Sequence, residues 1–153
     1  MPTITSSYLY TFFAVIAVTN ILLVSFIGYA NAIRFSSETR KLKNLMDYVA
    51  AKTTELATLA TATNASAEAF LQAPTAIGDK LYWLRLRNDS VKAWLEGGLG
   101  NTPTEAMELR VYLPSKALAS GHYFSGYGAI RIACSVNADV IQIQLSSSSL
   151  NGG

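Results

Sequence analysis

The stretch YLYTFFAVIAVTNILLVSFIGYA, from Tyr8 to Ala30, decides the architecture of this chain. It contains no charged residue, and no Asp, Glu, Lys or Arg occurs before Arg34. About 20 apolar residues in a helix suffice to cross the ~30 Å hydrocarbon core of a bilayer. Because apolar residues occupy every face, lipid or other protein must surround such a helix. The stretch therefore predicts a transmembrane helix or the core helix of a filament.

Asn20 is the one odd residue in the middle of this stretch. A polar amide in hydrocarbon needs a hydrogen-bond partner, which either a neighbouring helix or its own helix backbone can supply. Both alternatives stay open at this point. The residues predicted to form an assembly helix here are Phe12, Phe13, Ile16, Asn20, Leu23 and Ile27.

The helical pattern continues beyond the uncharged stretch. From Asn31 to Thr63 there is no Pro or Gly, and apolar residues recur at helical spacing with charged residues off the stripe. We therefore predict one helix from Tyr8 to about Thr63, which would be about 80 Å long. Its stripe must meet other helices, its own head domain, or both. Further assembly contacts are predicted at Leu42, Met46, Val49 and Leu56.

The last third of the chain changes to the two-residue period of strands. Residues 80–87 (KLYWLRLR) and 90–96 (SVKAWLE) flank a turn signal at Asn88-Asp89 and predict a hairpin. Alternation returns in three later runs, at residues 107–113, 129–136 and 139–145, with a loop at 97–105 and a Gly-rich stretch at 121–128. Five or six short strands indicate a small antiparallel sandwich or barrel. The fold class is thus α+β, with a long helix over residues 1–69 and a β-rich head over residues 70–153.

The composition argues against a catalytic or metal-binding site. The chain has 153 residues, a net charge of +2, one Cys and one His, which excludes a disulfide framework and a two-histidine metal motif. No dense basic run offers a footprint for nucleic acid. His122 has no nucleophile at meaningful spacing, Cys134 lies on the buried side of a strand, and Gly97-Gly98-Leu99-Gly100 opens no helix as a phosphate loop would. We predict no catalytic activity, no cofactor and no metal.

Two N-x-S triplets, Asn64-Ala65-Ser66 and Asn88-Asp89-Ser90, fit the acceptor pattern for N-glycosylation. One lies at the predicted helix end and the other in the predicted hairpin turn, where a glycan can reach. Asn64 and Asn88 are therefore the predicted sites of attached glycans.

The charges around the apolar stretch conflict with export of the head. Arg34, Arg40, Lys41 and Lys43 follow it and nothing basic precedes it, so the positive-inside rule places the C-terminal domain in the cytoplasm. Outward export requires basic residues upstream. Removal of a short basic leader would reconcile the two, and Met1 would then be the first residue of a processed chain.

The layout resembles archaeal type IV pilins and the related archaellins. The matching parts are the uncharged helix of residues 8–30, its unbroken amphipathic extension, and the late strands GYGAIRIACSV and DVIQIQL. The resemblance implies a leader cut by a prepilin peptidase and an immunoglobulin-like, glycosylated head. It also implies insertion in the membrane before assembly and an extracellular homopolymer for adhesion or motility.

Three functions are consistent with this pattern. The first is a structural subunit of a cell-surface filament that polymerises through its N-terminal helix. The second is a membrane-anchored β-sandwich, a binding or stator-like accessory protein of a surface filament machine. The third is an accessory subunit of an enzyme whose chemistry lies elsewhere.

Overall fold

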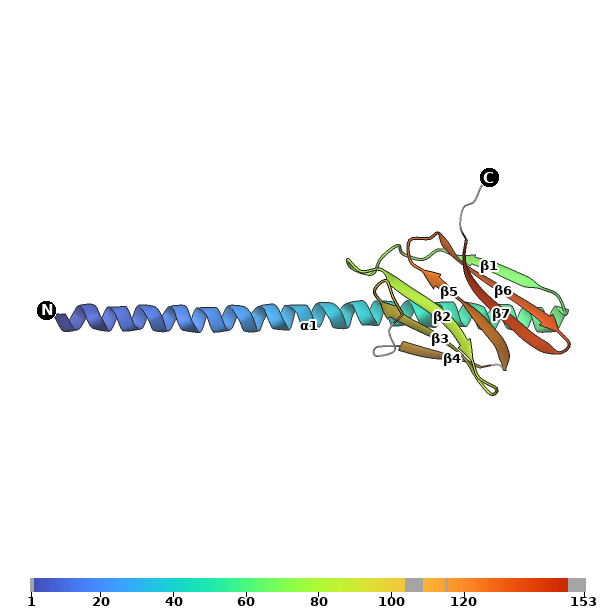
Figure 1. Ribbon diagram of the computed structural model, residues 1–153, viewed down its shortest axis with the longest axis horizontal. Helices are drawn as coiled ribbons and strands as arrows, with labels where there is room; N and C mark the ends of the chain where they lie inside the picture. Colours follow the sequence, from blue (N-terminus) through green and yellow to red (C-terminus); the bar gives the residue numbers. More distant parts are fainter. Residues whose placement is uncertain (1, 104–108, 115, 149–153) are drawn as a thin grey trace. The chain divides into compact units, whose positions relative to one another are not determined.

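The computed structural model describes residues 2–103, 109–114 and 116–148, in which one α-helix is followed by seven strands (Figure 1). The predicted α+β class, with a long apolar helix before a strand-rich head, is confirmed. The elements are α1 (Pro2–Thr63), β1 (Ala67–Leu71), β2 (Tyr82–Asn88), β3 (Ala93–Leu99), β4 (Leu109–Leu113), β5 (Ala117–Phe124), β6 (Ala129–Asn137) and β7 (Val140–Ser148).

The chain divides into two compact units, residues 1–37 and residues 38–153. The division falls inside α1, so the second half of the helix belongs with the strands. We call residues 38–153 the head. The boundary expected from the sequence, between residues 69 and 70, lies within β1.

The continuous helix predicted from Tyr8 to Thr63 is confirmed, and it begins earlier, at Pro2. Proline suits a first helical position because the amide hydrogen it lacks has no partner there. The helix ends where Asn64 takes a left-handed conformation, with φ of 50°. The Ala65 amide then donates to the Ala60 carbonyl at 3.3 Å, which satisfies one of the open carbonyls of the last turn.

The seven strands form one sheet in the order β1-β6-β7-β5-β2-β3-β4. All neighbours are antiparallel except β5 and β7, which run parallel. The predicted hairpin of β2 and β3 is confirmed, and the Asp89 carboxylate closes its turn by accepting from the amides of Val91 and Lys92 at 2.7 and 2.6 Å.

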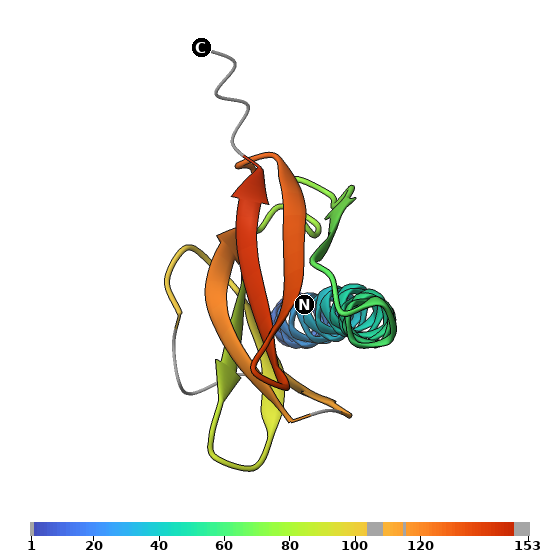
Figure 2. The ribbon, with the colours of Figure 1, turned by 90° about the vertical axis from the view of Figure 1, so that its right-hand side faces the viewer.

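The second half of α1 covers one face of this sheet (Figure 2). Its buried residues join the inward-facing strand residues in one apolar core. From α1 these are Leu42, Met46, Val49, Ala50, Ala57 and Ala60, and from the strands they include Tyr82, Leu84, Leu86, Leu95, Tyr123, Ile130, Ile132, Cys134, Ile143 and Leu145. The predicted antiparallel sandwich needs correction, because the helix supplies the second layer and the strands make a single mixed sheet.

The sequence pattern missed strand residues at three places. β1 follows the helix directly, residues 97–99 extend β3, and the whole of β5 (Ala117–Phe124) was not predicted. Glycine hides the end of β3 at Gly97 and Gly98 and interrupts the alternation of β5 at Gly121, because it carries no side chain. Met107, which the pattern placed on the strand before Leu113, lies outside the described residues.

Trp83 is also more buried than its alternation predicts, with 1% of its surface exposed. Its indole lies against Gly98, where an added Cβ would come within 2.8 Å of the ring. The other side of β3 is equally tight, because a Cβ on Gly97 would meet the Met46 sulfur at 2.8 Å. The two glycines therefore let a tryptophan and the helix approach β3 from opposite faces.

Gly121 is the glycine on which the parallel pair depends. Its φ is +108°, and an added Cβ would meet the Leu145 carbonyl oxygen on β7. We expect Gly121→Ala to lower the free energy of unfolding of the head by about 3 kcal/mol or more, from backbone strain and a clash with backbone. Urea unfolding of the full chain in detergent, followed by tryptophan fluorescence, measures this change.

Gly126→Ala is the matched control. Gly126 also has a positive φ, of +88°, but an added Cβ meets nothing within 4 Å. This variant should lose only about 1 to 2 kcal/mol, the cost of the left-handed conformation. Equal losses in the two variants would contradict the role given to the contact between Gly121 and Leu145.

Candidate functional site

The first candidate site is the apolar segment of α1, residues 8–33. Large side chains on every face of this segment are exposed within the structure, among them Tyr8 with 73% of its surface exposed and Ile33 with 53%. In the described part of the chain α1 is the helix long and apolar enough to span a membrane, and none of its most apolar window is buried. Such a helix is compatible with membrane insertion or with a signal sequence. The predicted assembly residues Phe12, Phe13, Ile16, Asn20, Leu23 and Ile27 are all exposed.

The predicted assembly stripe beyond the apolar segment requires a correction. Leu42, Met46 and Val49 are at most 1% exposed because they form the helix side of the head's own core. Leu56 is partly buried and packs against the same core. These four residues are therefore not a free surface for neighbouring helices. The sequence had left open that the head itself covers this stripe, and the structure shows that it does.

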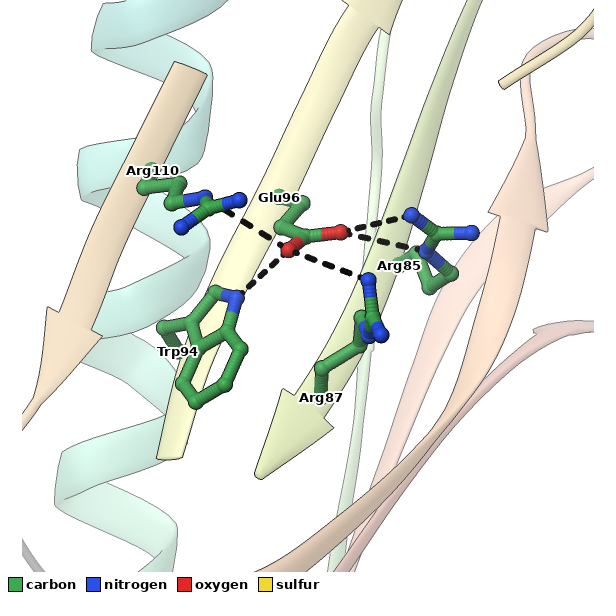
Figure 3. A network of polar contacts seen from close by, with 5 residues as sticks. All are labelled: Arg85, Arg87, Trp94, Glu96 and Arg110. Atoms are coloured by element: carbon green, nitrogen blue, oxygen red, sulfur yellow. Dashed lines mark hydrogen bonds and ion pairs between the residues drawn. The ribbon is translucent and has the colours of Figure 1, made fainter. Parts of the chain in front are cut away.

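The second candidate site is a charged cluster on the side of the sheet that points away from α1 (Figure 3). Its centre is Glu96 on β3, a carboxylate that is fully buried. Arg85 Nη2 and Nε donate to Glu96 Oε2 at 2.7 and 3.2 Å, and the Trp94 indole donates to Oε1 at 2.6 Å. Arg87 Nη1 and Arg110 Nε lie 3.7 and 3.6 Å from Oε1. Three guanidinium groups thus surround one carboxylate.

Burial of Glu96 opposes its charged form, yet the hydrogen bonds from Trp94 and Arg85 and the positive charges of Arg85 and Arg87 lower its pKa overall. The carboxylate is therefore ionised. The guanidinium groups also stack on aromatic rings: Arg85 lies 5.5 Å from the Trp83 ring centroid and Arg110 lies 5.9 Å from that of Trp94.

Strand register places the centre of this cluster in a row of paired residues that crosses four strands. Arg110 pairs with Glu96, Glu96 with Arg85, and Arg85 with His122. The sequence analysis noted the alternation of these strands but did not bring the residues together. The turn signal would not have found the cluster, because a two-residue turn at Asn88-Asp89 would set Arg85 opposite Lys92, whereas in the structure Asn88 is a strand residue that pairs with Ala93 and Arg85 pairs with Glu96.

The remaining predicted positions are less informative. Asn64 is exposed and Asn88 half-buried, and their glycosylation stays a prediction. Cys134 is buried as predicted, and burial raises the pKa of its thiol to about 11, which keeps the thiol protonated near neutral pH. Within residues 2–103, 109–114 and 116–148, no group of three or more His, Cys, Asp or Glu side chains could hold a metal ion.

Comparison with protein-family models, with curated proteins and with solved structures finds no match to this chain. The function must therefore be inferred from the residues of the chain itself.

Glu96 gives a prediction about stability. Glu96→Gln leaves three guanidinium groups without their buried counter-charge, so we expect the free energy of unfolding at pH 7 to fall by about 3 kcal/mol. Because folding lowers the pKa of Glu96, its charge stabilises the head above the ordinary value of 4.5, and this contribution is lost as the pH falls through the lowered value. The difference between the two chains should therefore shrink in acid, as measured by urea unfolding from pH 7 to 3.

Glu68→Gln is the control. Glu68 also pairs with an arginine, Arg131 at 2.7 Å, but both side chains are nearly half exposed. An exposed pair contributes at most about 1 kcal/mol. If the two variants lose the same stability at every pH, the buried carboxylate has no special role.

Proposed function

We propose that this chain is a structural subunit of an extracellular filament, of the type IV pilus kind, that polymerises through its apolar segment and is inserted in the membrane before assembly. The observation that carries the proposal is an uncharged helix whose large apolar side chains are exposed on every face. In a filament, equivalent helices from other copies would cover that surface. Burial contributes about 25 cal/mol for each Å² of apolar surface.

The length of the apolar segment supports burial in protein. Residues 8–33 form a helix of about 39 Å at ~1.5 Å per residue, whereas a hydrocarbon core is about 30 Å thick. Asn20 also fits a bundle, because its amide can bond to a neighbouring helix. Adhesion and motility remain the two roles that such a filament could serve, and attached glycans at Asn64 and Asn88 belong to the same proposal.

The alternative is a membrane-anchored accessory protein. One observation favours it: the head covers Leu42, Met46 and Val49 without help from another copy. A monomer therefore leaves only the apolar segment in need of cover, and a tilted helix of this length fits a bilayer. The two proposals differ in what finally surrounds the apolar segment, which is helices of other copies in the first and lipid in the second.

Electron microscopy of cell-surface material, combined with N-terminal sequencing of the chain found there, tests the proposal. Helical filaments made of this chain, with the apolar segment retained, are expected. A dispersed species that needs detergent to stay in solution would favour the anchored protein. A chain that starts after the segment would mean that the segment is a removed signal sequence and would overturn both.

A triple variant separates packing in protein from anchoring in lipid. Phe12→Ala, Ile16→Ala and Leu23→Ala keep the helix apolar, so the chain should still fractionate with membranes. Close packing between helices depends on side-chain shape, and large-to-small changes cost about 2 to 5 kcal/mol at each buried site. We therefore expect filament yield, scored by microscopy and sedimentation, to fall at least tenfold.

The matched control removes three exposed apolar side chains from the head: Phe70→Ala, Leu118→Ala and Val140→Ala. This variant should assemble with a yield close to that of the native chain. Normal filaments from the Phe12, Ile16 and Leu23 variant would contradict assembly through the apolar segment.

A further inference from the structure

We infer that a groove in the head binds a neutral polysaccharide. The inference concerns the head alone and does not rest on polymerisation. The groove consists of three hollows, of about 580, 350 and 330 Å³. Gln144 lines both the first and the second hollow, and Phe124 and Tyr127 line both the second and the third. The hollows therefore adjoin one another and form one groove.

The first hollow lies on the face of the sheet that points away from α1. On β7, Ile143 and Leu145 belong to the core that α1 covers. Successive side chains of a strand point to opposite faces of a sheet. Gln142 and Gln144 therefore point away from α1, and both are exposed.

A small residue gives the first hollow its depth. Ala133 of β6 pairs with Gln144 of β7 on one side and with Glu68 of β1 on the other. Because Ala133 ends at its Cβ, the row across the three strands is lowest at this point. The long side chains of its two neighbours form the walls.

The polar side chains of the first hollow have unused hydrogen-bonding capacity. Four of them are uncharged: Ser120, Ser135, Gln142 and Gln144. Among the described residues, none of these four side chains makes a hydrogen bond to another group of the protein. Each amide offers two donors and an acceptor, and each hydroxyl both donates and accepts. The hydroxyl groups of a sugar also donate and accept, so they can pair with all four side chains.

The charges in the groove are paired with each other. Among the described residues that line the three hollows, Glu68 is the acidic residue and Arg131 the basic one, apart from His122. Arg131 Nε and Nη2 donate to Glu68 Oε2 at 3.1 and 2.7 Å. A ligand in this groove therefore meets a closed ion pair and otherwise mainly uncharged groups, which favours a neutral ligand.

Aromatic side chains stand where the second and third hollows meet. Tyr127 lies in the turn between β5 and β6 and has 68% of its surface exposed. The Tyr123 hydroxyl donates to the Gly128 carbonyl at 2.9 Å, which ties this turn to the core. The face of an aromatic ring carries partial negative charge, and the C–H groups of a sugar ring can stack on it. The groove thus offers both an apolar surface for the ring of a sugar and polar partners for its hydroxyl groups.

Other classes of ligand fit this groove less well. An added peptide strand uses the free backbone groups at the edge of a sheet, whereas the first hollow lies over β6 and β7, which are paired on both sides. An acyl chain would leave the amide and hydroxyl groups without partners. A nucleic acid needs cations along its path. A polysaccharide can place successive sugar rings in adjoining hollows, and such multivalent contact raises its affinity.

The test measures binding of soluble neutral polysaccharides to the full chain in lauryldimethylamine oxide micelles, because this detergent has no sugar headgroup that could compete. The probes are dextran, galactomannan and laminarin, with polygalacturonate and single-stranded DNA for comparison. We expect at least one neutral polysaccharide to bind, with an affinity that changes less than about twofold between low and high salt, because no new ion pair forms. Binding of none of the three, or tighter binding of polygalacturonate or DNA, would overturn the inference.

Substitutions locate the binding in the groove. Tyr127→Ala should weaken binding of the neutral polysaccharide about tenfold, whereas Tyr127→Phe, which keeps the ring, should stay within about twofold of the native chain. The double variant Gln142→Ala and Gln144→Ala should weaken binding about tenfold through lost hydrogen bonds. All three residues are exposed, so the head should keep its fold. Native affinity in both Tyr127→Ala and the glutamine pair would overturn the assignment to the groove.

The matched control is Tyr48→Ala. Tyr48 is also an exposed tyrosine of the head, with 48% of its surface exposed, but it lies on α1, which covers the opposite face of the sheet. Binding by this variant should equal that of the native chain within about twofold, because Tyr48 does not line the groove. A loss as large as that of Tyr127→Ala would mean that any exposed aromatic ring suffices and would overturn the site.

Discussion

The packing of the second half of α1 on the sheet is the interaction on which the head depends. A sheet with one apolar face must cover that face, and here a helix does so instead of a second sheet. Ala57 and Ala60 allow the helix to approach closely, and Gly97 leaves room for Met46. One uninterrupted helix therefore has two parts. In residues 8–33 the large apolar side chains are exposed, whereas in the second half one apolar stripe is buried in the core of the head.

The burial of the second half of α1 in the head changes the interpretation of its amphipathic stripe. A stripe of Leu42, Met46 and Val49 on a long helix suggests contact with other helices, but the head already uses it. Any contact with other copies in the proposed filament must therefore come from the apolar segment or from the exposed surface of the head.

The charged cluster follows a different physical rule. A buried carboxylate costs free energy of desolvation, and such clusters are often worth less to stability than apolar residues of the same size. Glu96 is nevertheless held in its charged form by Trp94 and Arg85. The arrangement holds three guanidinium groups around one carboxylate on one side of the sheet.

The sequence by itself determined the elements whose signals are local. The uncharged stretch to Ala30 and the amphipathic spacing that follows it without proline or glycine predicted the helix to Thr63, and alternation predicted β2, β6 and β7 with most of their buried residues. Only the tertiary structure decided which surface covers which, because periodicity marks an apolar face without naming its partner. The parallel pairing of β5 with β7 and the meeting of Arg110, Glu96 and Arg85 depend on strand order. Strand order is set by the best burial of the whole core, a property that no single segment of the sequence contains.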